Sequence, residues 1–358
     1  MSRRVIRQRV MLVILLLLLI TFSSTFRLPT ASAIDNCTEF LEYGDGLIPV
    51  TSYPQLIYDL DVNSNDVFVI SGDDEAVQPI PNRIKYLVVT GNYPLGLSLD
   101  RTDPEYLILI DATFGQPPVL GPLDTRRIFL QNVVVNTPED SIFRSTFWIS
   151  RINVESFFLR NVYVDAEMII AGVDAQCVEF RDVTIDKSSI DLPPELMSIQ
   201  YSLYVNDPNL IKRIAINAST FMDDVEIKVS TDEIDDRLVS ATHNKFMGGL
   251  SIEGKSGVAD LNLYGNTISE YLSLETLKIN GTLYFERNHL SGVFLPPASI
   301  EDATQVDAGN IMSNIRTDDG RDWINLLQNG GAGNSASKVE DWVERQTWLP
   351  WIYKLVFV

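Results

Sequence analysis

Apolar residues return every eleven positions between Val239 and Leu290, and this period constrains the fold more than any other feature of the chain. The repeating unit is a pair of apolar residues two apart, such as Leu250 and Ile252, with a third apolar position seven residues after the first. Fourteen of the fifteen positions defined in this way are apolar and only Gly257 is not, although apolar residues make up 45% of the whole chain. The other positions are Val239, Ala241, Phe246, Leu261, Leu263, Ile268, Leu272, Leu274, Ile279, Leu283, Phe285 and Leu290.

An asparagine recurs on every second unit, which doubles the period to 22 residues. Asn244, Asn266 and Asn288 each lie two residues before the third apolar position, and Asn310 continues the series. A fixed period of this size is typical of a solenoid, in which each coil buries its apolar face by stacking on the next. We therefore expect an all-β fold, a single parallel β-helix (β-solenoid) with about 21–22 residues per coil.

A looser repeat of the same kind precedes this region. Four of its strands carry Asp or Asn at one position: Asp111, Asn132, Asn161 and Asp182. Asp and Asn tolerate the left-handed backbone of a tight corner, so we interpret these residues as corner residues rather than catalytic ones. A longer step after the fourth strand predicts an inserted loop of about eight residues near 138–150, and such loops often form the binding face of a solenoid. The strands start at Val67, Leu87, Leu107, Ile128, Phe157 and Val178.

Residues 1–33 have the pattern of a secretory signal peptide. Several arginines precede the largely apolar run 10–22, and Ala31-Ser32-Ala33 forms a small-residue cleavage site. The apolar run is shorter than the ~20 residues that span a bilayer. An uncleaved membrane anchor is the alternative. We expect export, with the mature chain secreted or held in the cell envelope.

The mature chain divides into three parts. An irregular stretch, 34–66, is expected to cap the first coil, because an open solenoid end exposes apolar surface and unpaired strand edges. The solenoid follows over 67–312, with a possible joint at 191–208, where prolines interrupt the repeat. In the Trp-rich segment 313–358, Ser337 and Glu340 form a capping box that predicts a helix. Two interpretations of this segment are open: a helical cap on the last coil, or contact with a membrane interface.

The charge balance limits the partners. Without residues 1–33, which contain five arginines and no acid, the chain has 23 basic and 48 acidic residues and a net charge of about −25. A basic face is needed to bind phosphates, so nucleic acid is not expected as a partner. An acidic exported protein is consistent with solubility in salt, cation binding or basic partners.

Two cysteines and three glycosylation sequons suggest covalent modifications. Export permits a disulfide between Cys37 and Cys177, and two unpaired thiols are the alternative. The sequons begin at Asn36, Asn217 and Asn280, and they are used only if the source organism glycosylates proteins.

Candidate catalytic and metal-binding residues are few. Arg160 and Arg181 occupy equivalent positions one coil apart, next to Asn161 and Asp182, with Tyr163 nearby. An Arg or Tyr base beside carboxylates is the pattern a polysaccharide-cleaving site requires, but an outward polar ladder explains it equally. Acidic turns are candidates for binding Ca²⁺, although solvated carboxylates are the simpler interpretation. They contain Asp223, Asp224, Asp232, Asp235 and Asp236. No other cofactor is indicated.

The run from Leu261 to Phe285 resembles the eleven-residue LxLxxxxI repeats of uncharacterised bacterial membrane-associated β-solenoid proteins. In that group a short helical segment rich in Trp and Tyr follows the repeats, and residues 322–355 are similar to it. The earlier half is similar to right-handed parallel β-helices of the pectate-lyase type. A leucine-rich repeat also fits part of this run, but its single strand per repeat does not match the half-repeat of eleven.

These features favour an exported, non-enzymatic β-solenoid that acts as a structural or binding protein at the cell surface or envelope. Its partner would be a protein or a glycan, with membrane association through the N-terminal segment or the Trp-rich tail as a further expectation. The alternative is a carbohydrate-active enzyme, a polysaccharide lyase or glycoside hydrolase, with its site on the loops near 138–150 and 191–208. Carboxylates that converge beside an arginine in a concave groove would favour the enzyme.

Overall fold

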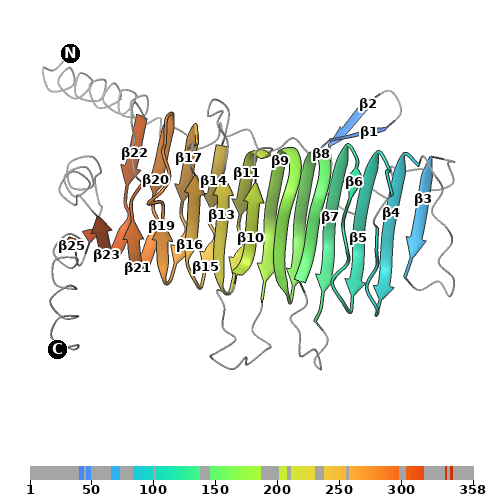
Figure 1. The fold of residues 1–358 in the computed structure, drawn as a ribbon, viewed down its shortest axis with the longest axis horizontal. Helices are drawn as coiled ribbons and strands as arrows, with labels where there is room; N and C mark the ends of the chain where they lie inside the picture. The colour runs from blue at the N-terminus through green and yellow to red at the C-terminus, as the bar shows by residue number, and fades with distance from the viewer. Residues whose placement is uncertain are drawn as a thin grey trace, which may run out of the picture. The chain divides into compact units, whose positions relative to one another are not determined.

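The computed structural model confirms an all-β parallel β-solenoid. It describes residues 40–43, 46–49, 66–72, 84–99, 102–137, 146–186, 201–207, 211–229, 238–254, 258–297, 304–317, 335–336 and 339–341. The chain divides into two units, 1–38 and 39–358, and all described residues belong to the second. Figure 1 shows the strands of this unit stacked side by side, coil upon coil.

Each coil contributes strands to three faces, which we number in chain order around the coil. Face 1 contains β3 (Val67–Ser71), β11 (Ile211–Asn217), β14 (Leu238–Thr242), β17 (Asp260–Tyr264), β20 (Thr282–Glu286) and β22 (Thr304–Ala308). Face 2 contains the short strands β12 (Thr220–Phe221), β15 (Lys245–Phe246), β18 (Thr267–Ile268) and β24 (Ser335–Ala336). Face 3 contains β10 (Tyr201–Asp207), β13 (Asp224–Val229), β16 (Leu250–Gly254), β19 (Tyr271–Ser273) and β25 (Val339–Asp341).

Several strands turn a corner and belong to more than one face. These are β4 (Tyr86–Tyr93), β5 (Tyr106–Phe114), β7 (Arg127–Val135), β8 (Thr146–Val164), β9 (Glu167–Ile185), β21 (His289–Leu295) and β23 (Ile311–Thr317). The two-residue strand β6 (Leu123–Asp124) pairs with the corner of β8 at Ile152 and Asn153. Within the interval 34–66, β1 (Phe40–Tyr43) and β2 (Gly46–Pro49) form an antiparallel hairpin, whereas all pairings of the coils are parallel.

The parallel pairings place equivalent residues of successive coils in one row. On face 1 this row is Phe68, Leu87, Leu107, Ile128, Phe157, Val178, Ile214, Val239, Leu261, Leu283 and Gln305. The starts predicted from Leu87 to Val178 are therefore confirmed. The predicted start at Val67 is wrong by one residue, because Leu87 pairs with Phe68 and Val67 pairs with Tyr86.

The core is a continuous apolar column inside the coils. All fourteen apolar positions of the eleven-residue repeat are at most 2% exposed. Leu250 pairs with Leu272 on face 3 and Leu261 with Leu283 on face 1, so the two half-repeats form opposite walls of one coil. Aromatic rings stack along the same column, as in Phe221 and Phe246, whose centroids are 5.3 Å apart. Burial of these side chains is the main stabilising contribution, of the order of 1.5–3 kcal/mol for each large residue.

Face 1 of the amino-terminal coils is buried on both sides. Residues 106–110 are all inaccessible, although alternate side chains of a strand point to opposite sides. The outward row continues through Val88, Phe129, Phe158 and Glu179, each at most 4% exposed. A parallel sheet covered on both sides reads as a continuous apolar run, which explains the sequence Tyr-Leu-Ile-Leu-Ile. The outer side of this face is therefore not open to a partner.

The corner between faces 1 and 2 uses a left-handed residue in coil after coil. Asp111, Asn132, Asn161 and Asp182 have φ between 43° and 54°. This confirms that the recurring Asp or Asn forms a tight corner. The amide of Asn132 donates to the carboxylate of Asp111 (2.9 Å), and that of Asn161 donates to the side-chain oxygen of Asn132 (2.7 Å).

In the carboxyl-terminal coils a buried asparagine follows the left-handed residue. Asn244, Asn266, Asn288 and Asn310 are at most 2% exposed. The side-chain oxygen of Asn266 accepts from both the backbone and the side-chain amide of Asn244, each at 3.0 Å. The side-chain amide of Asn266 donates to the carbonyl of Ala241 (2.7 Å) and to Asn288 (3.0 Å). The same contacts repeat down the stack, so the 22-residue spacing is the spacing of a hydrogen-bonded ladder.

Three segments differ from the sequence expectations. Residues 146–150, assigned to the inserted loop, belong to β8 and pair with 167–171, which leaves 138–145 as the extra residues of this step. Residues 201–207, in the interval of the possible joint, form β10 and pair with both β9 and β13. Val339–Asp341, expected to be helical, forms β25 on β23, because an open parallel edge offers hydrogen bonds that outweigh a local helix preference.

The remaining parts of the predicted cap and tail, and the predicted signal peptide, lie outside the described residues. Among the residues that are described, no helix has the length and apolar character to cross a membrane.

Candidate functional site

An open groove of about 650 Å³ lies along the side of the amino-terminal coils, next to the start of face 1. Its acidic residues are Asp66, Asp103, Glu105, Asp124 and Glu155, and its basic residues are Lys85 and Arg126. The loops just before β3, β4, β5, β7 and the face 1 part of β8 supply these side chains. The lining is therefore net acidic, with five carboxylates against two cations.

One row of the groove alternates in charge from coil to coil. Val67, Tyr86, Tyr106, Arg127 and Ser156 occupy one register position on face 1. The residues immediately before them are, in the same order, Asp66, Lys85, Glu105, Arg126 and Glu155. Acid and base thus alternate at the spacing of neighbouring parallel strands, roughly 4.8 Å. Opposite charges at this spacing stabilise one another and the stacking of the coils.

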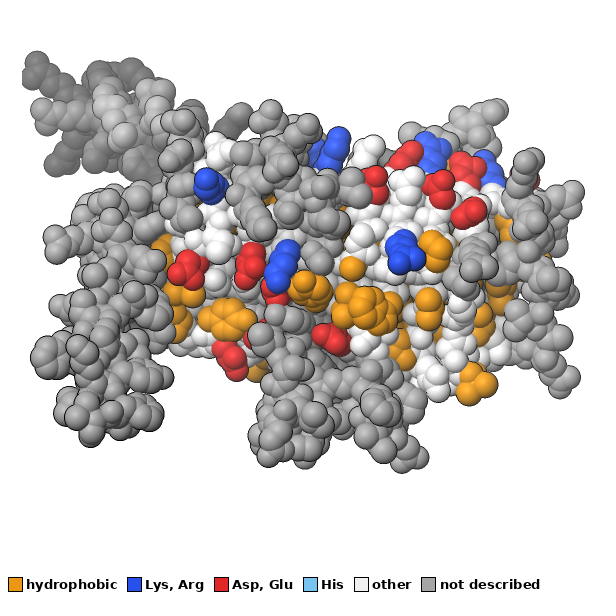
Figure 2. Space-filling view, in the orientation of Figure 1, with side chains coloured by type: hydrophobic (Ala, Val, Ile, Leu, Met, Phe, Trp, Pro, Cys, Tyr) orange, Lys and Arg blue, Asp and Glu red, His pale blue; other side chains and the backbone are white. Residues whose placement is uncertain are grey.

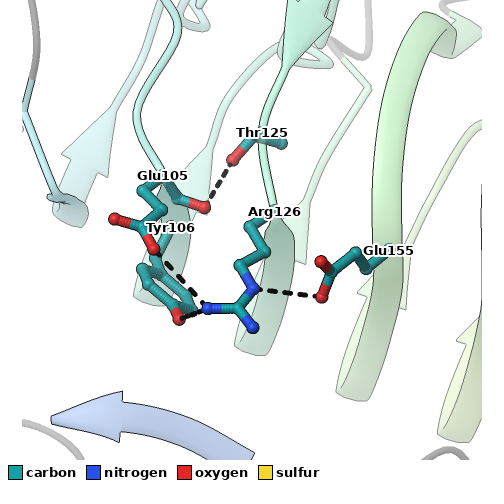
Figure 3. Close-up of polar contacts among 5 residues, drawn as sticks. All are labelled: Glu105, Tyr106, Thr125, Arg126 and Glu155. Carbon is teal, nitrogen blue, oxygen red and sulfur yellow. Dashed lines mark hydrogen bonds and ion pairs between the residues drawn. The ribbon is translucent and has the colours of Figure 1, made fainter.

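Arg126 is the centre of this row (Figure 3). Its Nε donates to Glu155 at 3.1 Å, and its Nη1 lies 3.7 Å from the carboxylate of Glu105 and donates to the Tyr106 hydroxyl at 3.2 Å. The neighbouring Thr125 is buried and donates its hydroxyl proton to the backbone carbonyl of Glu105 (3.1 Å). The guanidinium therefore has its donors engaged on both sides, and the two glutamates face the groove around it.

A second row runs parallel to the first. Asp103 accepts from the backbone N–H of Asp124 at 3.3 Å, and Asp124 accepts from the side-chain amide of Asn153 at 3.1 Å. Together the two rows present carboxylates, an amide and cations at regular intervals along the solenoid axis. Such a surface offers repeated hydrogen bonds to an extended ligand. In the part of the chain that the structure describes, no group of three His, Cys, Asp or Glu is arranged to hold a metal ion.

The predicted catalytic candidates lie elsewhere. Arg160 and Arg181 are paired neighbours on adjacent coils, as their spacing predicts. They are half-buried at the edge of the covered face, and Arg181 forms an ion pair with Glu179, which is 1% exposed. Asp182 forms the exposed corner beside them, with φ 54°. Burial of Glu179 gives Arg181 a structural partner rather than a substrate.

The predicted calcium candidates are separated by their roles. Asp224 accepts from the backbone N–H of Gly249 (2.7 Å) and from the hydroxyl of Tyr271 (2.9 Å), so its carboxylate connects three coils. A methyl group on Gly249 would approach the ring of Tyr271 to 2.2 Å, which explains the glycine. Asp223 is half-buried, and Asp232, Asp235 and Asp236 lie outside the described residues.

The predicted modification sites are only partly described. Cys177 is 6% exposed and is disulfide-bonded, whereas Cys37 lies outside the described residues, so their pairing stays a prediction. Asn280 is exposed and Asn217 is half-buried, with its side-chain oxygen accepting from the Thr242 hydroxyl. Asn36 also lies outside the described residues.

Two titrating groups outside the groove are shifted by their surroundings. The pKa of Tyr163 is raised, first by burial and then by the negative charges of Asp186 and Asp165. The pKa of Lys228 is raised mainly by its hydrogen bond to Glu226, an effect that burial partly opposes. Lys228 also lies over the ring of Tyr204, with 5.3 Å from Nζ to the ring centroid.

The groove was missed by sequence reasoning, although a signal was present. Lys85, Glu105, Arg126 and Glu155 each lie two residues before a predicted strand start, at Leu87, Leu107, Ile128 and Phe157. Aligning the coils on those starts would have shown a column of alternating sign. Arg160 and Arg181 attracted attention instead because they form a pair of identical residues.

Comparison with known protein families, with characterised proteins and with solved structures finds none that the chain matches. Functional inference therefore depends on the geometry of the groove and of the solenoid surface.

Proposed function

We propose that the protein is an exported, non-enzymatic β-solenoid that binds a protein or glycan partner at the cell surface or envelope. The observation that carries this proposal is the charge row of the groove, in which Arg126 bridges Glu105 and Glu155. The polar groups recur at one-strand intervals and already satisfy one another, so they suit a surface that recognises an extended partner. Export is supported by the signal-like pattern of residues 1–33.

A reaction centre requires a group that is free to accept or donate a proton at the substrate. Arg126 is committed to two carboxylates and the Tyr106 hydroxyl. Asp124 is tied to Asn153, and Asp103 to the backbone of the next coil. Each group of the groove therefore has a structural contact to break before it could act in catalysis, which favours binding.

One observation favours the second candidate, a carbohydrate-active enzyme. Two carboxylates converge on an arginine in a concave groove, with ion-pair distances of 3.1 and 3.7 Å. Glu105 and Glu155 lie two coils apart, and the backbone spacing of roughly 10 Å between them is close to the separation of the two acids in inverting glycosidases. In that role one glutamate would protonate the glycosidic oxygen and the other would activate water.

Incubation of the mature chain, 34–358, with a panel of soluble polysaccharides and with intact cell envelopes separates the two candidates. Retention on a ligand and release of reducing ends or unsaturated products are measured in parallel. We expect retention without products, and a severalfold loss of retention in Arg126→Ala and Glu155→Gln. Glu270→Gln, which removes an exposed acid from a coil outside the groove, is the matched control.

Products that disappear in Glu155→Gln would replace the proposal with the enzyme. Retention that is the same in both groove variants and in the wild type would remove the groove from the binding surface.

A further inference from the structure

Face 3 carries a row of outward-facing apolar side chains across four coils. Leu120 pairs with Ile149, which places Val119 beside Trp148. Trp148 pairs with Ile169, and Ile169 pairs with Tyr204. We call these four residues the apolar row. Val119 and Trp148 are 46% and 47% exposed, and Ile169 and Tyr204 are half-buried.

The row interrupts the usual alternation of a solenoid strand. In β8, Phe147 and Ile149 are fully buried, so Trp148 between them points away from the core. Further along face 3 the same register position is occupied by Glu226, Ser251 and Ser273. Figure 2 shows hydrophobic side chains gathered over the middle of the visible face, where β8, β9 and β10 run. A contiguous exposed apolar patch on an otherwise polar surface marks an interaction site.

The charges around the row indicate the chemistry of the partner. The four residues carry no charge, and the next residue of the row, Glu226, is 4% exposed and ion-paired with Lys228. The chain as a whole has a net charge of −20, which repels polyanions. A nucleic acid or an acidic polysaccharide is therefore disfavoured, whereas a neutral partner meets no uncompensated charge along the row.

The spacing of the two aromatic residues fits a repeating ligand. Trp148 and Tyr204 are separated by one intervening strand, so their rings lie roughly 10 Å apart along the solenoid axis. This is close to the length of two linked pyranose units. The C–H face of a sugar packs on the face of an aromatic ring, and the Tyr204 hydroxyl and Lys228 offer hydrogen bonds to sugar hydroxyls.

We propose that the apolar row binds a neutral polysaccharide chain that lies along the solenoid axis, with alternate sugars stacked on Trp148 and Tyr204. The site is separate from the acidic groove, since none of its residues lines that groove. It therefore adds a glycan site of defined chemistry to the proposed binding function and can be tested apart from it.

The test compares Trp148→Ala, Tyr204→Ala and the double variant with the wild-type mature chain. Tyr163→Ala is the matched control, because Tyr163 is an aromatic residue 36% exposed on face 2. The probes are neutral β-1,4-linked glucan and mannan, with polygalacturonate as the anionic comparison, in sedimentation and affinity electrophoresis. Trp148→Phe, which keeps a ring, tests stacking directly, and thermal unfolding of each variant reports folding.

We expect a neutral glycan to bind, with an affinity about tenfold lower in Trp148→Ala and little changed in Trp148→Phe and Tyr163→Ala. Binding should not depend on salt, since no charge is involved. The proposal is overturned if neither neutral glycan binds, if polygalacturonate binds more tightly than both, or if Trp148→Ala binds like the wild type. It is also overturned if Trp148→Ala instead converts an oligomer of the chain to a monomer in sedimentation, since the row would then join two copies.

Discussion

In the coils between Val67 and Ile185 the corner after face 1 is an Asp or Asn that itself adopts the left-handed conformation, with its side chain at the surface. Between Ile211 and Met312 that conformation falls on Ala218, His243, Gly265, Arg287 or Gly309. Here the stacked residue is the next one along, Ser219 and then four asparagines in succession, and it is buried. The two regions thus make the same turn, but one orders its polar ladder in water and the other inside the protein.

The difference is reflected in the lengths of the coils. The face 1 register advances by 22 residues at each step from Leu238 to Asp260, Thr282 and Thr304. In the amino-terminal region the steps range from 19 residues, between Val67 and Tyr86, to 29 residues, between Arg127 and Ser156. A buried amide must meet its neighbour one strand away or leave polar groups unsatisfied, whereas an exposed one can turn to water. Buried ladders therefore favour uniform coils, and exposed ladders tolerate insertions.

Breaking the ladder in each region should give the largest contrast. Asn266→Ala leaves the N–H of Asn244 and the carbonyl of Ala241 without their side-chain partner. At roughly 1–3 kcal/mol for each orphaned group, we expect a loss of about 4 kcal/mol in the free energy of unfolding. Asn132→Ala, in the exposed ladder, should cost only about 1 kcal/mol. Urea denaturation of both variants measures the difference, and equal losses would contradict the distinction drawn between the regions.

Core truncation should, in contrast, affect both regions alike. Leu109 and Leu263 are fully buried on face 1. Replacing either by Ala should lower the free energy of unfolding by about 3 kcal/mol, the middle of the range for a buried leucine. A markedly smaller loss for Leu109→Ala, measured by the same denaturation, would show that the amino-terminal coils unfold separately from the rest.

The left-handed position itself should respond to glycine in only one region. Ala218 has φ 50° and lies in register with Asp182, because Asn217 pairs with Arg181. An alanine pays a steric cost in this conformation, so Ala218→Gly should stabilise the protein by about 1 kcal/mol. Asp182→Gly should change stability by less than about 0.5 kcal/mol, since Asp tolerates the conformation. Thermal unfolding of the pair, with midpoints compared to the wild type, checks this.

The smallest expected effect is on the pH dependence of the amino-terminal region. Because the pKa of Tyr163 is raised from 10.0 in the folded protein, its contribution to stability is complete below pH 10.0 and is lost as the pH rises through the raised value. Tyr163→Phe removes this loss, so its stability should fall less steeply than that of the wild type above pH 10.0. Denaturant titrations on either side of that pH measure it, and parallel curves would contradict the shift.

The fold could be predicted because the solenoid writes its period into the chain. Leu250 and Leu272 pair as their spacing predicts, and Asp111, Asn132, Asn161 and Asp182 take the corner conformation expected of them. Ends and irregular steps could not be predicted in the same way. Val339–Asp341 became a strand because an adjacent edge was available, which no local preference encodes.

The candidate sites were hidden for a different reason. Arg126 and Glu155 are 29 residues apart, and their contact depends on the inserted residues between them. Trp148 could have been found, since three large apolar residues in succession, Phe147, Trp148 and Ile149, cannot all face the core of a strand. Its partner Tyr204 could not, because the intervals that separate it from Ile169 obey no period.

The alternating charges beside face 1 also bear on how the stack is assembled correctly. Similar coils can be exchanged or skipped during folding at little cost in buried area. A stack that omitted the Arg126 coil would bring Glu105 against Glu155, and one that omitted the Glu105 coil would bring Lys85 against Arg126. Like charges one strand apart repel, so each omission is penalised. The sequence of signs acts as an address that tells every coil which neighbour it must have.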